Sequence, residues 1–254
     1  LKKSINRQRF FWRWDTPEKY QTNMRAYFRM LSGIDHVVGR LVTQLKKLGL
    51  AENTIIIYSA DNGYYLGDRG FAGKWTHYEQ SLRIPLVIFD PRAPQDKRKV
   101  VRSEMALNSD LGATMIELAG QPVPVSHTGR SLVPILKGES PKDWRTEFLC
   151  EFLAVPGTIP RWEGVRGTDW VYARYFVEGT DKPPFEFLHD LKNDPEQLLN
   201  ITTLPVHLQT EAHTLALLQL RTRCDALVRA NGLAMEAIPH RQKTKRKKPA
   251  PKKN

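Results

Sequence analysis

The chain has 254 residues, of which 41% are hydrophobic and 26% charged, and its formal net charge is +12. This composition is ordinary for a globular protein, and no run of about 18 apolar residues predicts a membrane span. Eight lysines and arginines lie between residues 241 and 254, and without them the chain carries 31 basic and 27 acidic residues. Most of the net positive charge therefore comes from the C-terminal end, and the rest of the chain is close to balanced.

The first long element predicted by the sequence is an amphipathic helix. Thr16 and Pro17 form a typical helix start, with a hydroxyl cap before a proline at the first helical position. Apolar residues then recur at steps of three and four as far as Leu48, and Gly49 follows as a stop signal. We therefore expect one continuous helix over most of residues 17–48.

Two short apolar runs follow, over residues 55–58 and 86–89, and a shorter helix is predicted over 109–119. The runs are rich in β-branched residues, as is typical of strands buried on both faces of a parallel sheet. Helix, buried strand, glycine-rich loop, buried strand and helix together indicate an α/β layer architecture.

The pattern changes after about residue 140. Short strands are expected over 148–153, 170–177 and 185–189, and a last amphipathic helix over roughly 206–230. They predict a small antiparallel sheet with one covering helix.

The chain is accordingly expected to have three parts. Residues 1–140 belong to the α/β layer, 141–239 form the small antiparallel-sheet subdomain, and 240–254 are a disordered basic tail. The tail could attract nucleic acid by charge alone, but nothing in the rest of the sequence predicts such binding. Cys150 and Cys224 belong to no metal-type pairing such as C-x-x-C, and two buried free thiols are favoured over one disulfide.

The residues with the clearest chemistry follow the first predicted strand. Asp61, Asn62 and Gly63 come directly after it, and a glycine-rich loop leads on to Lys74. Ligands of open α/β sheets bind beyond the carboxyl ends of the strands. A carboxylate and an amide oxygen are hard ligands that suit calcium or magnesium, and Gly63 would permit the turn that brings both onto one ion. Taken alone, the tripeptide favours a simple turn.

The longer context changes this interpretation. The pattern consists of Gly33-Ile34-Asp35, Val38-Gly39, Gly49-Leu50, Asn53-Thr54, Ser59 to Gly63, Leu66-Gly67, Gly73-Lys74, Tyr78-Glu79, Arg83 to Leu86, Asp110-Leu111, Leu118 to Gly120, Gly129 to Leu132, Leu136 to Gly138, Phe187 to Leu191 and Asn193 to Glu196. In combination it resembles the sulfatase family of the alkaline-phosphatase-like hydrolases. The resemblance implies an α/β fold with an alkaline-phosphatase-like mixed sheet and flanking helices, followed by a small α+β C-terminal subdomain with an antiparallel sheet.

The resemblance also implies a site. Asp61 and Asn62 would be two ligands of a calcium ion, with magnesium as the alternative, and Lys74 would contact the sulfate group. A dication and an ammonium would draw charge from the sulfate oxygens as the ester oxygen departs. His77 is a further candidate for substrate contact, although a loop histidine with structural partners is favoured. The implied substrate is a sulfated small molecule or carbohydrate, and the family's compartments are periplasmic, secreted or lysosome-like.

Other residues depart from the family pattern. The family's nucleophile is a hydrated formylglycine made from the cysteine of Cys-x-Pro/Ala-Ser-Arg, and neither Cys150 nor Cys224 has that context. The aspartate pair that completes the family's metal site lies upstream of anything present. We therefore expect an N-terminally incomplete sequence, with the formylglycine in the missing part, and no sulfatase turnover by the 254 residues alone. Arg69 stands where many relatives have histidine, which would alter substrate contacts.

Two alternative functions stay open at this stage. One is a phosphodiesterase or phosphonate hydrolase of the same superfamily, and the other is a non-catalytic cation-binding or glycan-binding module. The upstream segment would discriminate among them. Near the site, Glu79 and Arg83 are spaced as a helix-surface pair. A further group of residues could form a sugar-facing rim or serve packing: Arg161, Trp162 and Arg166.

Overall fold

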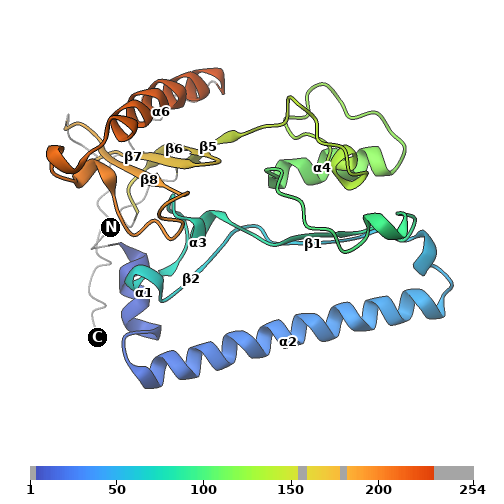
Figure 1. The fold of residues 1–254 in the computed structure, drawn as a ribbon. Helices are drawn as coiled ribbons and strands as arrows, with labels where there is room; N and C mark the ends of the chain where they lie inside the picture. Colours follow the sequence, from blue (N-terminus) through green and yellow to red (C-terminus); the bar gives the residue numbers. More distant parts are fainter. Residues whose placement is uncertain (1–3, 154–158, 178–181, 232–254) are drawn as a thin grey trace, which may run out of the picture.

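The computed structural model describes residues 4–153, 159–177 and 182–231, so the whole predicted basic tail lies outside the described residues. Figure 1 shows a mixed α/β chain with a C-terminal antiparallel sheet. Its helices and strands are α1 (Ile5–Arg13), α2 (Pro17–Lys47), β1 (Ile56–Ser59), β2 (Tyr65–Leu66), β3 (Ala72–Gly73), α3 (Glu79–Leu82), β4 (Leu86–Phe89), α4 (Asn108–Leu118), α5 (Val133–Leu136), β5 (Glu147–Phe152), β6 (Trp162–Gly167), β7 (Trp170–Tyr175), β8 (Phe185–Asp190) and α6 (Glu211–Ala230).

Helix α2 is the long helix that the sequence predicts. The side-chain oxygen of Thr16 accepts a hydrogen bond from the backbone N–H of Lys19, and Pro17 occupies the first helical position. The helix ends before Gly49, whose φ of 69° suits a residue without a Cβ. None of the 31 residues of α2 is buried, and apolar side chains such as Val37 remain 62% exposed. In the described part of the chain, α2 therefore has no covered face.

Strands β1 and β4 pair with each other in antiparallel register, with Ile56 opposite Phe89 and Ser59 opposite Leu86. This corrects the expectation of two strands buried in a parallel sheet. Within the described residues each strand has one neighbour, and Val87 and Phe89 are 58% and 46% exposed. The expectation was wrong because a continuous apolar run shows only a strand's hydrophobicity. It does not show the direction of its neighbour or which residues cover its faces.

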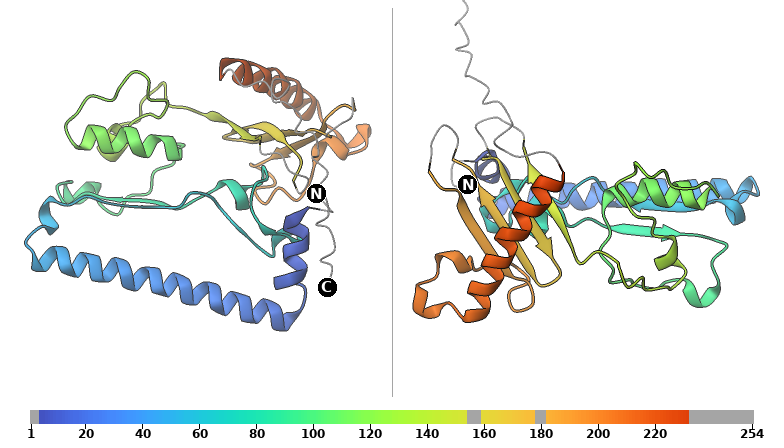
Figure 2. Two further views of the ribbon diagram at one scale, coloured as in Figure 1. Left: turned by 180° about the vertical axis from the view of Figure 1, so that it is seen from behind. Right: turned by 90° about the horizontal axis from the view of Figure 1, so that it is seen from above.

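Strands β5 to β8 form a four-stranded antiparallel sheet in chain order. Helix α6 crosses one face of this sheet, as the two views in Figure 2 show. On that face Val165 and Tyr172 pack against Cys224 and Val228 of the helix. The predicted sheet with one covering helix is therefore present, although regular α-helix begins only at Glu211.

Strand β6 is not predicted by the sequence, because its glycines are typical of a loop. A Cβ at Gly164 would lie 2.2 Å from the carbonyl oxygen of Tyr172, so the close approach of β7 requires glycine there. The sheet face away from α6 carries Trp162 and Tyr175, which cluster with Cys150. Both of these aromatic residues bond to the segment that follows Lys74, so this face positions the candidate site.

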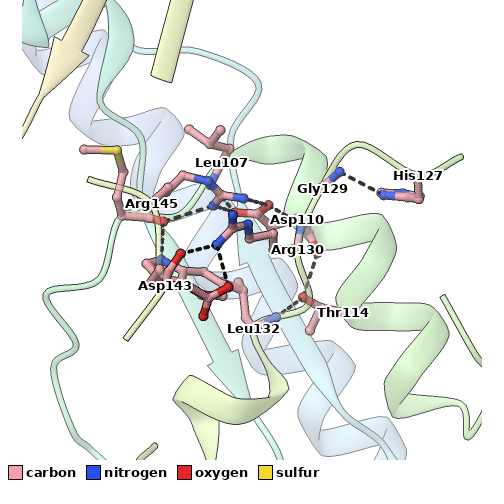
Figure 3. Close-up of polar contacts among 11 residues, drawn as sticks. Leu107, Asp110, Thr114, His127, Gly129, Arg130, Leu132, Asp143 and Arg145 are labelled. Carbon is pink, nitrogen blue, oxygen red and sulfur yellow. Dashed lines mark hydrogen bonds and ion pairs between the residues drawn. The ribbon is translucent and has the colours of Figure 1, made fainter. Parts of the chain in front are cut away.

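A buried carboxylate ties α4 to two later segments of the chain (Figure 3). Asp110 is fully buried, and its oxygens accept hydrogen bonds from the backbone N–H groups of Leu107, at 2.7 Å, and Arg130, at 2.8 Å. The guanidinium of Arg145, which lies just before β5, donates to the same carboxylate at 2.8 Å. Thr114 accepts a hydrogen bond from the N–H of Leu132. These contacts give a structural reason for the motifs around residues 110 and 129–132.

Candidate functional site

Asp61 and Asn62 lie at the carboxyl end of β1. The Asp61 side chain is 86% exposed, and its backbone carbonyl accepts a hydrogen bond from Asn108 at 3.1 Å. Gly63 allows this arrangement for a different reason from the one expected. The backbone of Gly63 does not have a positive φ, so it needs no left-handed turn. A Cβ at this position would, however, lie 2.3 Å from the carbonyl oxygen of Gln80. Gly63 is therefore required because α3 packs directly against its backbone.

Lys74 returns across the glycine-rich loop to the same place. Its Nζ donates a hydrogen bond to Oδ1 of Asn62 and lies 3.9 Å from Oδ2 of Asp61. The Lys74 side chain is 29% exposed. The structure thus brings the three predicted site residues together at the end of β1, with two hard oxygen donors beside one ammonium.

The backbone from Lys74 to Thr76 is held by side chains from three other elements. Asn6 of α1 donates to the carbonyl of Lys74 at 2.7 Å, and Trp162 of β6 donates to the carbonyl of Trp75 at 2.8 Å. The hydroxyl of Ser81 in α3 accepts the N–H groups of Trp75 and Thr76, at 2.8 and 3.2 Å. The sequence gives no signal for Asn6 and Ser81, since an asparagine in a helix or a serine after a turn has no distinctive pattern.

His77 is buried with both ring nitrogens occupied. Nδ1 of His189 lies 2.7 Å from the carbonyl oxygen of Leu199, which can only accept, so Nδ1 carries the proton. Nε2 of the neutral His189 then accepts from Nε2 of His77 at 3.1 Å, and Nδ1 of His77 accepts from the hydroxyl of Tyr175 at 2.9 Å. This chain of hydrogen bonds favours the structural role of His77 over the contact with substrate.

Burial shifts the titration of both histidines. Desolvation holds the pKa of His77 well below its ordinary value, with His189 and Arg69 adding in the same direction. Desolvation is also the main cause that lowers the pKa of His189 to about 4. The pair is therefore neutral over the physiological range.

Arg69 contacts Tyr78 and the segment after β8. It has a φ of 56°, its guanidinium lies 4.0 Å from the centre of the Tyr78 ring, and it donates to the carbonyl oxygens of Glu196 and, at 2.9 Å, Gln197. These contacts hold the glycine-rich loop against the segment after β8. The expectation that Arg69 alters substrate contacts is not supported by this geometry.

One further prediction around the site is corrected, and one open alternative is decided in favour of packing. Glu79 pairs with Arg166 of β6 through two 3.0 Å hydrogen bonds and not with Arg83, because α3 ends before Arg83, which is extended and exposed. Arg161 and Trp162 are only 4% and 2% exposed. These two residues are therefore packed in the interior and do not form an exposed rim.

The two cysteines do not fit the role of a nucleophile. Cys150 and Cys224 are both buried free thiols, as expected from the sequence. Desolvation raises the pKa of Cys150 and raises that of Cys224 to about 12, so neither forms a thiolate at neutral pH. No step of a reaction can be derived through either of them.

The oxygen donors partly fit a calcium site. A carboxylate and an amide oxygen have the right chemistry, but calcium takes about six to eight oxygens. In the stretches that the structure describes, no three His, Cys, Asp or Glu side chains are grouped to hold a metal ion. Asp61 and Asn62 could thus supply only part of a coordination shell. Among the described helices, none has the length and hydropathy needed to cross a membrane.

Comparison with known families identifies the family of the chain. The family model described as Sulfatase matches residues 5–121, and the one described as N-sulphoglucosamine sulphohydrolase, C-terminal, matches residues 67–222, which is more than half of the chain. The chain belongs to the sulfatase family. The N-acetylglucosamine-6-O-sulfatase of Bacteroides thetaiotaomicron is 34% identical over 187 residues, which cover 72% of this chain and 32% of that protein.

Solved sulfatase-like structures extend the comparison. A protein determined in complex with its substrate D-glucosamine-2-N,6-O-disulfate has a TM-score of 0.73 and 28% identity, covering 83% of this chain and 41% of that one. A phosphonate monoester hydrolase from Silicibacter pomeroyi has a TM-score of 0.67 and 27% identity, covering 84% and 44%. The chain therefore spans about a third of the curated relative's length and less than half of each solved structure.

Proposed function

We propose that this chain provides part of the metal and sulfate site of a sulfuric-ester hydrolase that acts on sulfated carbohydrate. The observation that carries the proposal is the position of Lys74, whose Nζ bonds to Asn62 and lies 3.9 Å from Asp61 at the carboxyl end of β1. An ammonium has three donors. One donor points to Oδ1 of Asn62, which leaves two for the oxygens of a sulfate group.

The roles of the residues follow from their chemistry. Lys74 would orient the sulfate and stabilise the negative charge that grows on its oxygens as the ester bond breaks. Asp61 and Asn62 would contribute oxygens to a calcium ion, with magnesium as the alternative. When bound, the metal would supply Lewis-acid polarisation of the sulfate. The formylglycine nucleophile that the family resemblance implies has no counterpart in Cys150 or Cys224.

The carbohydrate substrate is supported by the relatives. The Bacteroides relative is named for a sulfated N-acetylglucosamine, and the solved relative holds a disulfated glucosamine. A phosphonate or phosphodiester substrate is the second candidate, because the phosphonate monoester hydrolase shares the fold at 27% identity.

A chimeric enzyme tests the proposal. The segment of the Bacteroides sulfatase that aligns with this chain is replaced by the residues of this chain, and hydrolysis of 4-nitrophenyl sulfate and phenyl phosphonate esters is measured. We expect sulfatase turnover that falls at least about a hundredfold in Lys74→Ala, as for loss of one charge-stabilising donor. The exposed lysine at the end of α2 gives the matched control, Lys46→Ala, which should leave turnover unchanged. A folded chimera that hydrolyses only phosphonate esters, or is unaffected by Lys74→Ala, contradicts the proposal.

A further inference from the structure

The residue after Lys74 has a rare backbone conformation. Trp75 has a φ of 80°, in the left-handed region that a bulky residue occupies only at a cost in free energy. Such strain persists where the surrounding structure fixes it, and it clusters at ligand sites. Here the hydrogen bonds donated by Asn6 and Trp162, and the one accepted by Ser81, hold the backbone on both sides of Trp75.

The conformation places the indole beside the proposed sulfate contact. Nζ of Lys74 lies 5.8 Å from the centre of the Trp75 ring, and the guanidinium carbon of Arg9 lies 5.3 Å from it. The ring of Phe152 in β5 lies 6.2 Å away at an interplanar angle of 32°. An aromatic wall and two cations thus meet at one position.

Lys74, Trp75 and Phe152 line a pocket of about 280 Å³. Its polar lining consists of Asn62, Lys74, Thr76 and Glu151, with the ammonium of Lys74 as the anion-binding group, and its aromatic walls contain Trp75, Phe148, Phe152 and Trp162. A pocket with an anion-binding group and apolar aromatic walls is complementary to a ligand with an anionic group on a ring. A short alkyl sulfate would reach the anion-binding group without contacting the walls.

We propose that Trp75 is a specificity-determining residue, and that this pocket takes the ring of a ring-bearing sulfate ester while Lys74 contacts the sulfate. The proposal rests on the proposed function, because it uses the same sulfate contact. The shared chemistry is a ring with an apolar face, whether aryl or sugar. The left-handed backbone turns the indole into the pocket wall, and the hydrogen bonds around it keep the wall rigid.

The test measures dissociation constants of the 254-residue chain by NMR titration in the presence of calcium. The ligands are inorganic sulfate, ethyl sulfate, phenyl sulfate and glucose 6-sulfate. In the wild type we expect phenyl sulfate to bind about tenfold more tightly than ethyl sulfate, as for one aromatic contact. The ranking of phenyl sulfate against glucose 6-sulfate then shows which kind of ring the pocket prefers.

The decisive variant is Trp75→Gly, because glycine accepts the left-handed backbone without strain. It should bring the ratio of phenyl to ethyl sulfate affinity close to one, while inorganic sulfate binding changes by less than about twofold. The control Trp12→Ala removes an exposed indole from α1 and should keep the wild-type ratio. A wild-type ratio of one, or a ratio that survives Trp75→Gly, overturns the inference.

Failure of the proposed function has a different signature. If inorganic sulfate does not bind, or binds equally well to Lys74→Ala, the sulfate contact itself is wrong. Phenol, which carries no sulfate, still reports on the pocket in that case. Saturation transfer to phenol that is lost in Trp75→Gly would show that the aromatic wall exists, and transfer that persists would contradict it.

Discussion

The buried pair His77 and His189 should make the protein less stable in mild acid. In the unfolded chain both histidines have a pKa of about 6.5, whereas burial lowers the folded pKa of both and sets that of His189 at about 4. Below pH 6.5 the unfolded state therefore binds more protons than the folded state. The free energy of unfolding falls as the pH drops, until the folded His189 also takes up a proton near pH 4.

The size of the effect follows from these values. For each pH unit between the unfolded and the folded pKa of a histidine, the free energy of unfolding changes by about 1.4 kcal/mol. Between a pH of about 7.5 and one of about 5.5, His189 should remove about 1 kcal/mol, and His77 acts in the same direction. Urea unfolding at both pH values measures the loss. In His189→Gln the loss should shrink by at least the share of His189, because an amide does not titrate.

The control for this prediction is His36→Gln, which changes an exposed histidine of α2. It should reproduce the wild-type pH dependence. Carboxylates with a lowered pKa, such as Glu186, also weaken the fold in acid, but they act equally in all three proteins. An equal pH dependence in wild type and His189→Gln would refute the assignment of His77 and His189 as a neutral, hydrogen-bonded pair. It would mean that the pair already carries a proton in the folded protein.

Three further outcomes are expected. Asp110→Ala should lower the free energy of unfolding, measured with urea, by about 3–5 kcal/mol, because it leaves the largely buried Arg145 without its partner. A loss below about 1 kcal/mol would contradict the role of this contact. Gly63→Ala should cost about 1–3 kcal/mol by the same measurement, because the added methyl meets backbone of α3 at 2.3 Å, and a neutral effect would mean that α3 moves freely. Cys150 and Cys224 should react with a thiol reagent no faster than the protein unfolds, and rapid labelling of the native chain would show that they are not buried.

Local patterns in the sequence predict part of this structure. The cap at Thr16 and the stop at Gly49 define α2 because helix ends are set by neighbouring residues. Asp61, Asn62 and Lys74 are also close in sequence, so one strand end and one loop are enough to bring them together. The family resemblance added their chemistry, which the residues alone did not specify.

Long-range packing explains what the sequence does not reveal. Asn6 lies 68 residues from Lys74, and Trp162 lies 87 residues from Trp75, so no periodic pattern links them. The antiparallel direction of β1 and β4 depends on the path of the chain between them and not on their apolar residues. The left-handed conformation of Trp75 was equally hidden, because tryptophan rarely adopts it without such support.

The most direct test of the central claim is sulfate binding by the 254-residue chain. NMR titration with inorganic sulfate and calcium would compare the wild type with Lys74→Ala, Asp61→Ala and the control Lys46→Ala. The account predicts that Lys74→Ala weakens sulfate binding about tenfold, as for one charge-assisted contact, while Lys46→Ala has no effect. Asp61→Ala should remove the part of the affinity that depends on calcium. Equal sulfate affinity in all four proteins would contradict the site.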